Sequence, residues 1–527
     1  MRTLSVLTWI GNAAAVLCGR HGAVTTQAKQ AGCSRQAAYD QARRVEQVVA
    51  QTQTAGPHST ASTPERAPLP DENRQLWEAL DQAIDFPPAK QQQFAALAAA
   101  LGLSLNQTES LLAVVLPNAA CPSRATLGRW VQAAARQAGV ILPTLDAACQ
   151  GVVSELCLDE IFCHRQPVLI GVEPHSMTWV LGQRVPNRRG ETWQQALQPW
   201  TNLEAVVSDA GSGLHAGLEK FQQQRPQTPG GRTLDVGLDL FHGKQEAQRV
   251  LRLRWTPVEQ AWLKAERADE ILAAKRWHGH KLPAQHAAHA ANRAWRKVEK
   301  LFAAYEHQEA AWRRVETAFE LYRPDGRLND RRWAQAEITQ ALAALTASVW
   351  SGVRNFVQDR RSLTFLDRLH RRLAEAEPRV ELRAALVELW RLGQAWRRGR
   401  GPRLEGAGRV ICPLLQALIC QRLASDWRVA YGRVARVLSR TVRASSVVEC
   451  MNSVVRMHQA RHRTLSQALL DLKRLHWNCR TFVTGKRRDA CPYQHLSLSL
   501  PTYDWWQLLH RDPTELAQQL STTKVAA

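Results

Sequence analysis

Two short apolar runs each deliver one aspartate, and they restrict the possible folds more than any other feature of the sequence. Residues 156–162 (LCLDEIF) carry Asp159, and residues 203–208 (LEAVVS) lead directly into Asp209. Apolar runs of this length are typical of buried β-strands, and two parallel strands would bring both carboxylates to one edge of a sheet. Glu160 would point to the opposite face from Asp159, so Asp159 is the expected functional acid and Glu160 is the alternative.

A third acid, Glu449, stands much later in the chain, within the sequence ASSVVECMN. Residues 446–460 are predicted to form a helix, on which Asn452 and Arg456 follow Glu449 at i+3 and i+7 and therefore share its face. The other face is apolar and is expected to pack on the sheet through Val447, Cys450, Val454 and Met457.

Three carboxylates on two strands and one helix suit hard divalent cations, because Mg²⁺ prefers oxygen ligands and an incomplete protein cage. Two such ions about 4 Å apart can clamp both the attacking and the leaving oxygen of a phosphodiester. We therefore expect Asp159, Asp209 and Glu449 to be the catalytic residues and the ligands of two Mg²⁺ ions, for which Mn²⁺ could substitute. Asp235 and Asp239 flank the next apolar run and are the alternatives to Asp209.

The charge balance of the chain points to a polyanionic partner. The 527 residues include 69 Lys and Arg against 47 Asp and Glu, a formal net charge of +22. Such a field favours nucleic acid, and the excess of Arg over Lys suits phosphate groups and guanine edges because the guanidinium is a planar fork. Together with the three acids, this charge predicts double-stranded DNA as the partner. No run reaches 18 apolar residues and no polybasic tail adjoins an apolar anchor, so no membrane partner is expected.

The 11 cysteines are scattered, with no CxxC pair and no zinc-finger spacing. Several lie within apolar runs, as reduced core cysteines do. Near the start of the chain, Gly11 and Asn12 interrupt the apolar stretch that a secretion signal would need. The sequence therefore predicts a cytoplasmic, nucleoid-associated protein without structural zinc or disulfides.

Residues 1–50 are predicted to hold a helix-turn-helix. Residues 28–39 (AKQAGCSRQAAY) place a glycine at the turn and Ser34 where it can cap the second helix. The start of that helix is the part expected to reach DNA, and it carries Arg35, Gln36 and Tyr39. Residues 51–72 form a polar, proline-containing linker.

Residues 73–148 are expected to form a second helical, DNA-binding module. Residues 105–116 would be its first helix, and Ser123 would cap a further helix that carries Arg124 and Arg129. Small helical hairpins without DNA are common, so for both modules the prediction depends on the basic character of the chain.

Between residues 149 and 243 the pattern changes from helices to strands. The expected strands are residues 156–163, 167–173, 177–185, 205–208 and 234–241. With amphipathic helices expected at 191–200 and 213–222, the order β-β-β-α-β-α-β resembles that of RNase H-like folds, whose active site lies at the carboxyl ends of adjacent strands. His242 follows the last run and could orient DNA or a leaving oxygen.

Strand patterns are missing between residues 244 and 440, where helical periodicity predicts an all-helical insertion. Residues 441–490 would return to the core with its last helices and Glu449, and residues 491–527 would form a C-terminal tail. The predicted class is therefore α+β and rich in helix. It consists of an RNase H-like mixed sheet, interrupted by a large all-helical insertion and preceded by helix-turn-helix modules.

At these residues the chain resembles the DDE-type transposases of bacterial insertion sequences, in the subgroup with a helical domain inserted before the last acid. The similar stretches are LDE at 158–160, VSDA at 207–210, LFH at 240–242, SSVVECMN at 445–452 and LHWNCRTF at 475–482. The Glu-x-x-Asn helix is the most specific of them. The resemblance implies that Asp159, Asp209 and Glu449 bind two Mg²⁺ ions, that activated water nicks DNA at the element end, and that the freed 3′-OH attacks target DNA.

DNA contacts are expected from both N-terminal modules and from the region around the three acids. The expected DNA-binding residues are Arg35, Gln36, Tyr39, Arg124, Arg129, His242, Asn452, Arg456, Arg461 and Arg463. Because two element ends must be joined, a homodimer or higher oligomer on DNA is expected.

Two alternatives remain open at this point: a related metal-dependent nuclease, and a non-catalytic DNA-binding protein derived from a transposase. Two candidate DNA-reading modules favour transposition over a general nuclease. The presence of all three acids argues against the non-catalytic protein.

Overall fold

The computed structural model describes residues 12, 15–16, 23–31, 33–34, 36–43, 86–116, 121–225, 233–397, 408–460 and 465–525. The chain divides into two compact units, Met1–Asp85 and Phe86–Ala527, and each is described by itself. None of the described helices is both long enough and apolar enough to cross a membrane.

The first unit contains helix α2 (Ala23–Ala31) and a second helical segment at residues 36–43. Ser34 lies just before the second segment, and its Oγ accepts a hydrogen bond from the Ala37 amide at 3.1 Å. Ser34 is therefore the helix cap that the sequence predicts.

The second unit contains one mixed five-stranded sheet, with the strand order β3-β2-β1-β4-β5. The strands are β1 (Glu155–Cys163), β2 (Gln166–Val172), β3 (Trp179–Arg184), β4 (Ala205–Ser208) and β5 (Asp235–Leu238). β1, β2 and β3 form an antiparallel meander, whereas β4 runs parallel to β1 and β5 runs parallel to β4. The predicted α+β class with a mixed sheet is confirmed.

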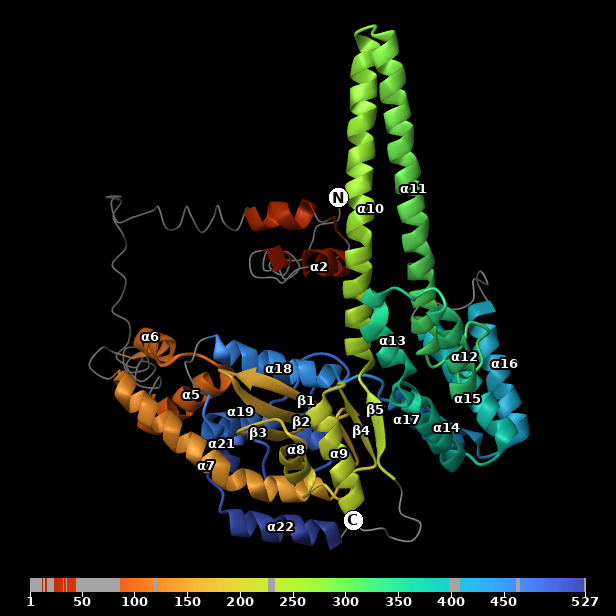
Figure 1. Cartoon of the computed structure of the whole chain (residues 1–527). Coiled ribbons are helices and arrows are strands. Elements are labelled where there is room, and N and C mark those ends of the chain that lie inside the picture. The colour runs from red at the N-terminus through yellow and green to blue at the C-terminus, as the bar shows by residue number, and fades with distance from the viewer. Residues whose placement is uncertain are drawn as a thin grey trace, which may run out of the picture. The chain divides into compact units, whose positions relative to one another are not determined.

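Side chains of β1 alternate between the two faces of the sheet. Leu156 and Leu158 join a core with three helices, α7 (Arg124–Gln150), α8 (Gly190–Leu197) and α9 (Ser212–Gln224). Cys157 and Ile161 pack on the opposite side, where α18 (Ser446–Gln459) lies (Figure 1). Asp159 follows the second pattern and therefore faces α18.

Of the four residues predicted for the packing face of α18, Val447, Cys450 and Val454 are partly buried against the sheet, and Met457 is the exception. Val448, Met451 and Val455 are fully buried, whereas Met457 is 52% exposed. Met457 was therefore wrongly assigned to the core. Successive residues of an α-helix are turned by about 100°, so a face centred on Val448, Met451 and Val455 leaves Met457 toward solvent.

The segment between β5 and α18 is largely helical in its described parts. It begins with two long helices, α10 (Leu240–Trp277) and α11 (Lys281–Ala318), which lie side by side as a hairpin (Figure 1). The shorter helices that follow are α12 (Arg331–Leu342), α13 (Ser351–Gln358), α14 (Thr364–Ala376), α15 (Val380–Arg397), α16 (Gly408–Leu423) and α17 (Trp427–Ser439), with short 3₁₀ turns η1 (Ser348–Trp350) and η2 (Arg360–Leu363).

The start of this helical segment corrects the sequence prediction. The expected strand at 234–241 is too long, because β5 ends at Leu238 and α10 begins at Leu240. The buried Asp239 between them caps α10 by accepting a hydrogen bond from the Phe241 amide at 2.9 Å. His242 therefore lies in the first turn of a helix and not at the end of a strand.

Helices from both ends of the second unit complete the core around the sheet. Before β1 stand α5 (Pro88–Leu101), α6 (Leu105–Val115) and α7, and after α18 stand α19 (Gln467–Cys479), α20 (Pro492–His495), α21 (Trp505–Leu509) and α22 (Pro513–Val525). α19, α21 and α22 all contact α7. Residues predicted only as a C-terminal tail thus contribute Leu508, Leu509 and Leu516 to the main core.

Candidate active site

Asp159 and Asp209 occupy equivalent places on two neighbouring parallel strands. Leu158 of β1 pairs with Ser208 of β4, and each aspartate is the next residue along its own strand. The two carboxylates repel each other electrostatically, and this repulsion contributes to the raised pKa of Asp159. The structure therefore brings the two predicted acids together, Asp159 in the middle of β1 and Asp209 directly after the carboxyl end of β4.

The Asp159 carboxyl group is buried, with 7% of the residue exposed. Its Oδ2 accepts a hydrogen bond from Asn452 Nδ2 at 2.7 Å, and its Oδ1 accepts one from the Glu160 amide at 2.8 Å. Burial nevertheless dominates and raises the pKa of Asp159 to about 6, with a further increase from the nearby Asp209. The hydrogen bonds to Asp159 and the nearby charge of His242 therefore do not offset the cost of burying its carboxylate.

Asp209 is half-buried in the loop between β4 and α9. Its Oδ1 accepts a hydrogen bond from the Gly211 amide at 3.0 Å, and its backbone oxygen contacts His215 Nε2 at 2.8 Å. Arg361 of η2 donates to the other ring nitrogen of His215 at 2.6 Å, which makes Nδ1 the acceptor and leaves the proton on Nε2. Burial lowers the pKa of His215, in keeping with a neutral ring. The helical insertion therefore holds the backbone of Asp209 through Arg361 and His215.

Asp239, which the sequence suggested only as an alternative ligand, joins the starts of two helices. Its side chain is fully buried and accepts hydrogen bonds from the Ser445 amide at 3.0 Å and the Ser445 hydroxyl at 2.6 Å. Ser445 is the residue before α18, and Asp239 itself caps α10. Asp239 thus fixes the first turns of α10 and α18, which carry His242 and Glu449, beside each other.

His242 is held as a cation facing the acids. Its Nδ1 lies 2.6 Å from Asp239 Oδ2, and its Nε2 lies 3.8 Å from Glu449 Oε1. The hydrogen bond to Asp239 raises the pKa of His242 to about 9, and the charges of Asp159 and Asp209 add to this effect. At neutral pH both ring nitrogens therefore carry protons, and the one on Nε2 points toward the acids.

Glu449 lies in the first turn of α18, but its carboxylate is turned toward cations. Arg456 Nη1 stands 3.6 Å from Oε2, on the same helix face as predicted, and His242 lies near Oε1. Asn452, the third residue of that face, binds Asp159 instead. In the described parts of the chain, no three or more His, Cys, Asp or Glu side chains are gathered closely enough to hold a metal ion as they stand.

Several observations nevertheless fit a divalent cation at Asp159 and Asp209. Neither carboxylate has a Lys or Arg ion-pair partner among the described residues; their hydrogen-bond donors are amides. A buried oxygen atom beside Asp159, Asn452 Oδ1, has no hydrogen-bond partner within the described structure. Buried oxygen atoms without compensating protons are the ligand type that Mg²⁺ and Mn²⁺ prefer.

Acids at the opposite ends of the same strands are compensated by arginines of α14. Arg372 pairs with Glu155 at the start of β1 and with Glu204 just before β4, and Arg371 pairs with Asp235 at the start of β5. These contacts dock the insertion on the sheet. Asp235, which the sequence suggested as an alternative to Asp209, is therefore paired with Arg371 at the start of its strand, away from Asp159 and Asp209.

Glu160, the alternative to Asp159, points to the other face of the sheet, where neighbouring side chains bind its carboxylate. Arg188 Nη1 lies 2.7 Å from its Oε1, and Trp193 Nε1 donates to its Oε2 at 3.3 Å. Because both carboxylate oxygens are engaged there, Asp159 is the better candidate of the two.

The predicted DNA-binding residues are distributed over several elements. In the first unit Gln36 donates to Asp40 and Tyr39 is 38% exposed, whereas Arg35 lies outside the described residues. Arg124 follows the cap Ser123 on α7 and pairs with Glu109, and Arg129 donates to Thr126.

Close to the acids, the exposed Arg456 is the described basic residue of α18 that the sequence suggested for DNA. Arg461 and Arg463 also lie outside the described residues.

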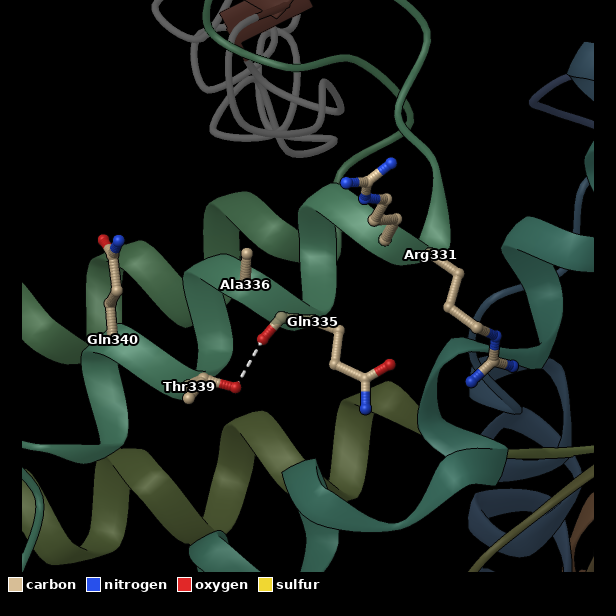
Figure 2. Close-up of a pocket in the computed structure, with 6 residues that line it drawn as sticks. Arg331, Gln335, Ala336, Thr339 and Gln340 are labelled. Atoms are coloured by element: carbon tan, nitrogen blue, oxygen red, sulfur yellow. Dashed lines mark hydrogen bonds between the residues drawn. The ribbon is translucent and has the colours of Figure 1, made fainter.

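A surface hollow on α12 is unrelated to these acids. Figure 2 shows its lining, in which Thr339 donates to the backbone oxygen of Gln335 at 2.8 Å. The lining residues are Arg331, Arg332, Gln335, Ala336, Thr339 and Gln340, and none of them is acidic. Arg331 is engaged by Asp367 at 2.7 Å, so this hollow offers neither metal ligands nor a free cation at that position.

No family model matches the chain, and no curated protein matches it.

Sequence reasoning missed Asp239 as the organiser of the site and overlooked His215 and Arg361. A signal for Asp239 was present, since Asp followed directly by a long helical pattern is a helix-cap signature. No local pattern connects Arg361 with His215, because 146 residues separate them.

Proposed function

We propose that this chain is a metal-dependent DNA strand transferase of the transposase class, which nicks element-end DNA and joins the freed 3′-OH to target DNA. The observation that carries the proposal is the pair Asp159 and Asp209, held side by side on adjacent parallel strands without a Lys or Arg ion-pair partner among the described residues. The strand order β3-β2-β1-β4-β5 agrees with the RNase H-like fold expected from the sequence. The net charge of +22 supports a DNA substrate.

Asp159, Asp209 and Glu449 are the residues that would hold divalent metal ions, which when bound would neutralise the scissile phosphate and activate the attacking oxygen. Asn452 fixes the orientation of the Asp159 carboxylate through its 2.7 Å hydrogen bond. The protonated Nε2 of His242 can donate to a phosphate or leaving oxygen, because Asp239 holds the ring in place from behind. Positioning and charge stabilisation suffice for phosphoryl transfer, so no nucleophilic side chain is required.

The test is cleavage and strand transfer of labelled duplexes that carry the DNA flanking the coding region, with Mg²⁺ or Mn²⁺. We expect Asp159→Asn, Asp209→Asn and Glu449→Gln each to reduce the rate by about 10²–10³-fold or more, as loss of a transition-state contact does, while DNA binding is kept. Asp235→Asn is the matched control, because it removes an acid from the neighbouring strand that Arg371 already engages.

Three results would contradict the proposal in different ways. Nicking without joining would indicate a nuclease. Binding without any cleavage would indicate a DNA-binding protein. Full activity of any one of the three variants would remove that acid from the site.

A further inference from the structure

Asp209 stands on a short connection, so its carboxylate has a fixed direction only where neighbouring groups hold it. β4 ends at Ser208 and α9 begins at Ser212. Within this connection, Asp209 Oδ1 accepts a hydrogen bond from the Gly211 amide at 3.0 Å. A Cβ atom at position 211 would lie 3.0 Å from the same oxygen, so glycine leaves the space that the carboxylate occupies.

The backbone of Asp209 is held separately, by His215 of α9. The His215 side chain is buried, and its Nε2 lies 2.8 Å from the backbone oxygen of Asp209. Because the peptide unit is planar, fixing this oxygen fixes the orientation of the backbone from which the carboxylate projects. His215 thus supports the direction of the acid without contacting its side-chain oxygens.

Arg361 determines which ring nitrogen of His215 carries the proton. Its Nη1 lies 2.6 Å from His215 Nδ1. A guanidinium can only donate, so Nδ1 is the acceptor and the proton is on Nε2, which donates to Asp209. Without Arg361, the other tautomer would place two acceptors, His215 Nε2 and the Asp209 oxygen, against each other.

Arg361 is itself held firmly within the helical insertion. Its Nε and Nη2 donate to the two carboxylate oxygens of Asp359 at 3.0 and 2.6 Å, and its amide donates to Asp359 Oδ1 at 2.8 Å. The turn η2, which contains Arg361, contacts β5, the neighbour of β4 in the sheet. An unbroken series of hydrogen bonds therefore runs from Asp359 through Arg361 and His215 to the backbone of Asp209.

We propose that Arg361 is a positioning residue for the divalent cation: it orients Asp209 through His215, so that docking of η2 on the sheet and binding of the cation strengthen each other. Groups that orient a metal ligand typically change metal affinity by about 10–100-fold. The coupling is reciprocal, because two linked equilibria shift each other by the same factor. It rests on the proposed function for the cation at Asp159 and Asp209, but its test requires no DNA.

A direct electrostatic effect of Arg361 on the cation would have the opposite sign. A positive side chain repels a divalent cation, so removal of its charge alone would tighten metal binding. Loss of the orientation of Asp209 weakens metal binding instead. The direction of the change in the dissociation constant therefore separates the two roles.

The first experiment measures Mn²⁺ binding to the metal-free protein, from the electron paramagnetic resonance signal of the free ion. Arg361→Ala and His215→Ala should each raise the dissociation constant by about 10-fold or more. Because the two side chains act in series, the double variant should bind Mn²⁺ no more weakly than His215→Ala. His215→Gln should bind more tightly than His215→Ala, since an amide can both donate to Asp209 and accept from Arg361.

The matched control is Arg360→Ala, which removes the same charge from the same turn at an exposed position. It should not weaken Mn²⁺ binding. Thermal unfolding of each variant in EDTA separates an effect on the metal site from a general loss of stability.

The second experiment needs no substitution to begin with. Hydrogen exchange of the backbone amides of η2 should slow when Mg²⁺ is added to wild type, because the cation favours the docked turn. The amides of α22 serve as the reference. In His215→Ala the slowing at η2 should be lost.

Unchanged or tighter Mn²⁺ binding by Arg361→Ala would overturn the coupling, and so would η2 amides that exchange equally fast with and without Mg²⁺. If wild type binds no Mn²⁺, or Asp209→Asn binds it as tightly as wild type, both the coupling and the metal site of the proposed function fail. If Arg361→Ala and His215→Ala lose affinity as expected but DNA is never cut, the coupling stands while the proposed function fails.

Discussion

Glu155 and Asp159 lie four residues apart on the same strand and the same face of the sheet, yet their environments are opposite. Both are buried, with 5% and 7% of each residue exposed. Burial would raise the pKa of Glu155, but the hydrogen bond with His175 and the charges of Arg368 and Arg372 lower it to about 2. Asp159 has no arginine partner, and burial raises its pKa to about 6 although the charge of His242 acts in the opposite direction.

The difference separates an acid that holds the fold together from the candidate functional acid. Ion pairs between a carboxylate of the sheet and an arginine of α14, such as Glu155 with Arg372, dock the helical insertion on the sheet. An uncompensated buried carboxylate costs stability, and such groups concentrate at functional sites. Three variants or conditions can break or sharpen this comparison.

The largest contrast is expected in stability. Glu155→Gln should destabilise the metal-free protein by about 3–5 kcal/mol, because it leaves buried arginines without their partner. Asp159→Asn should stabilise it by about 1–3 kcal/mol, because it removes a buried charge that lacks compensation. Urea unfolding in EDTA at pH 7 measures both, and equal destabilisation by the two substitutions would end the distinction.

A divalent cation should act on one of these acids alone. At 10–100 times its dissociation constant, Mg²⁺ should stabilise wild type by about 1–3 kcal/mol, because it supplies the charge that Asp159 and Asp209 lack. Asp159→Asn should lose most of this gain and Glu155→Gln should keep it. A gain retained in Asp159→Asn would place the cation elsewhere.

The smallest effect is expected from pH, again without metal. The pKa of Asp159 is about 6 when folded against a reference of 3.8, so protonation favours the folded state as the pH falls, and this contribution is lost again as the pH rises through 6. Between pH 7 and pH 5, wild type should gain about 1–2 kcal/mol relative to Asp159→Asn.

Glu155 should behave in the opposite sense. Its contribution is present above its reference pKa of 4.5 and is lost as the pH falls toward 2. Unfolding curves of wild type and both variants between pH 3 and pH 7 test the two signs together. A wild type that loses stability relative to Asp159→Asn between pH 7 and pH 5 would contradict the assignment.

Local pattern was sufficient for much of the sheet and for the candidate acids. Buried strands need apolar side chains in short runs, so the runs at β1 and β4 identified the strands on which Asp159 and Asp209 lie. The cap residues Ser34 and Ser123 were also correct, because capping involves neighbours in sequence. The prediction of the buried face of α18 was wrong at Met457. Several positions of this helix are apolar, and only packing against the sheet determines which of them are buried.

The sequence by itself determined the strands, the long helical segment after β5, the basic charge and the positions of the acids, because periodicity and composition are local properties. The tertiary structure alone decided which acid is compensated. Arg372 is 217 residues from Glu155, Ser445 is 206 residues from Asp239, and Asn452 is 293 residues from Asp159. Charge compensation depends on which groups folding brings together, and chain separations of this size leave no trace in local pattern.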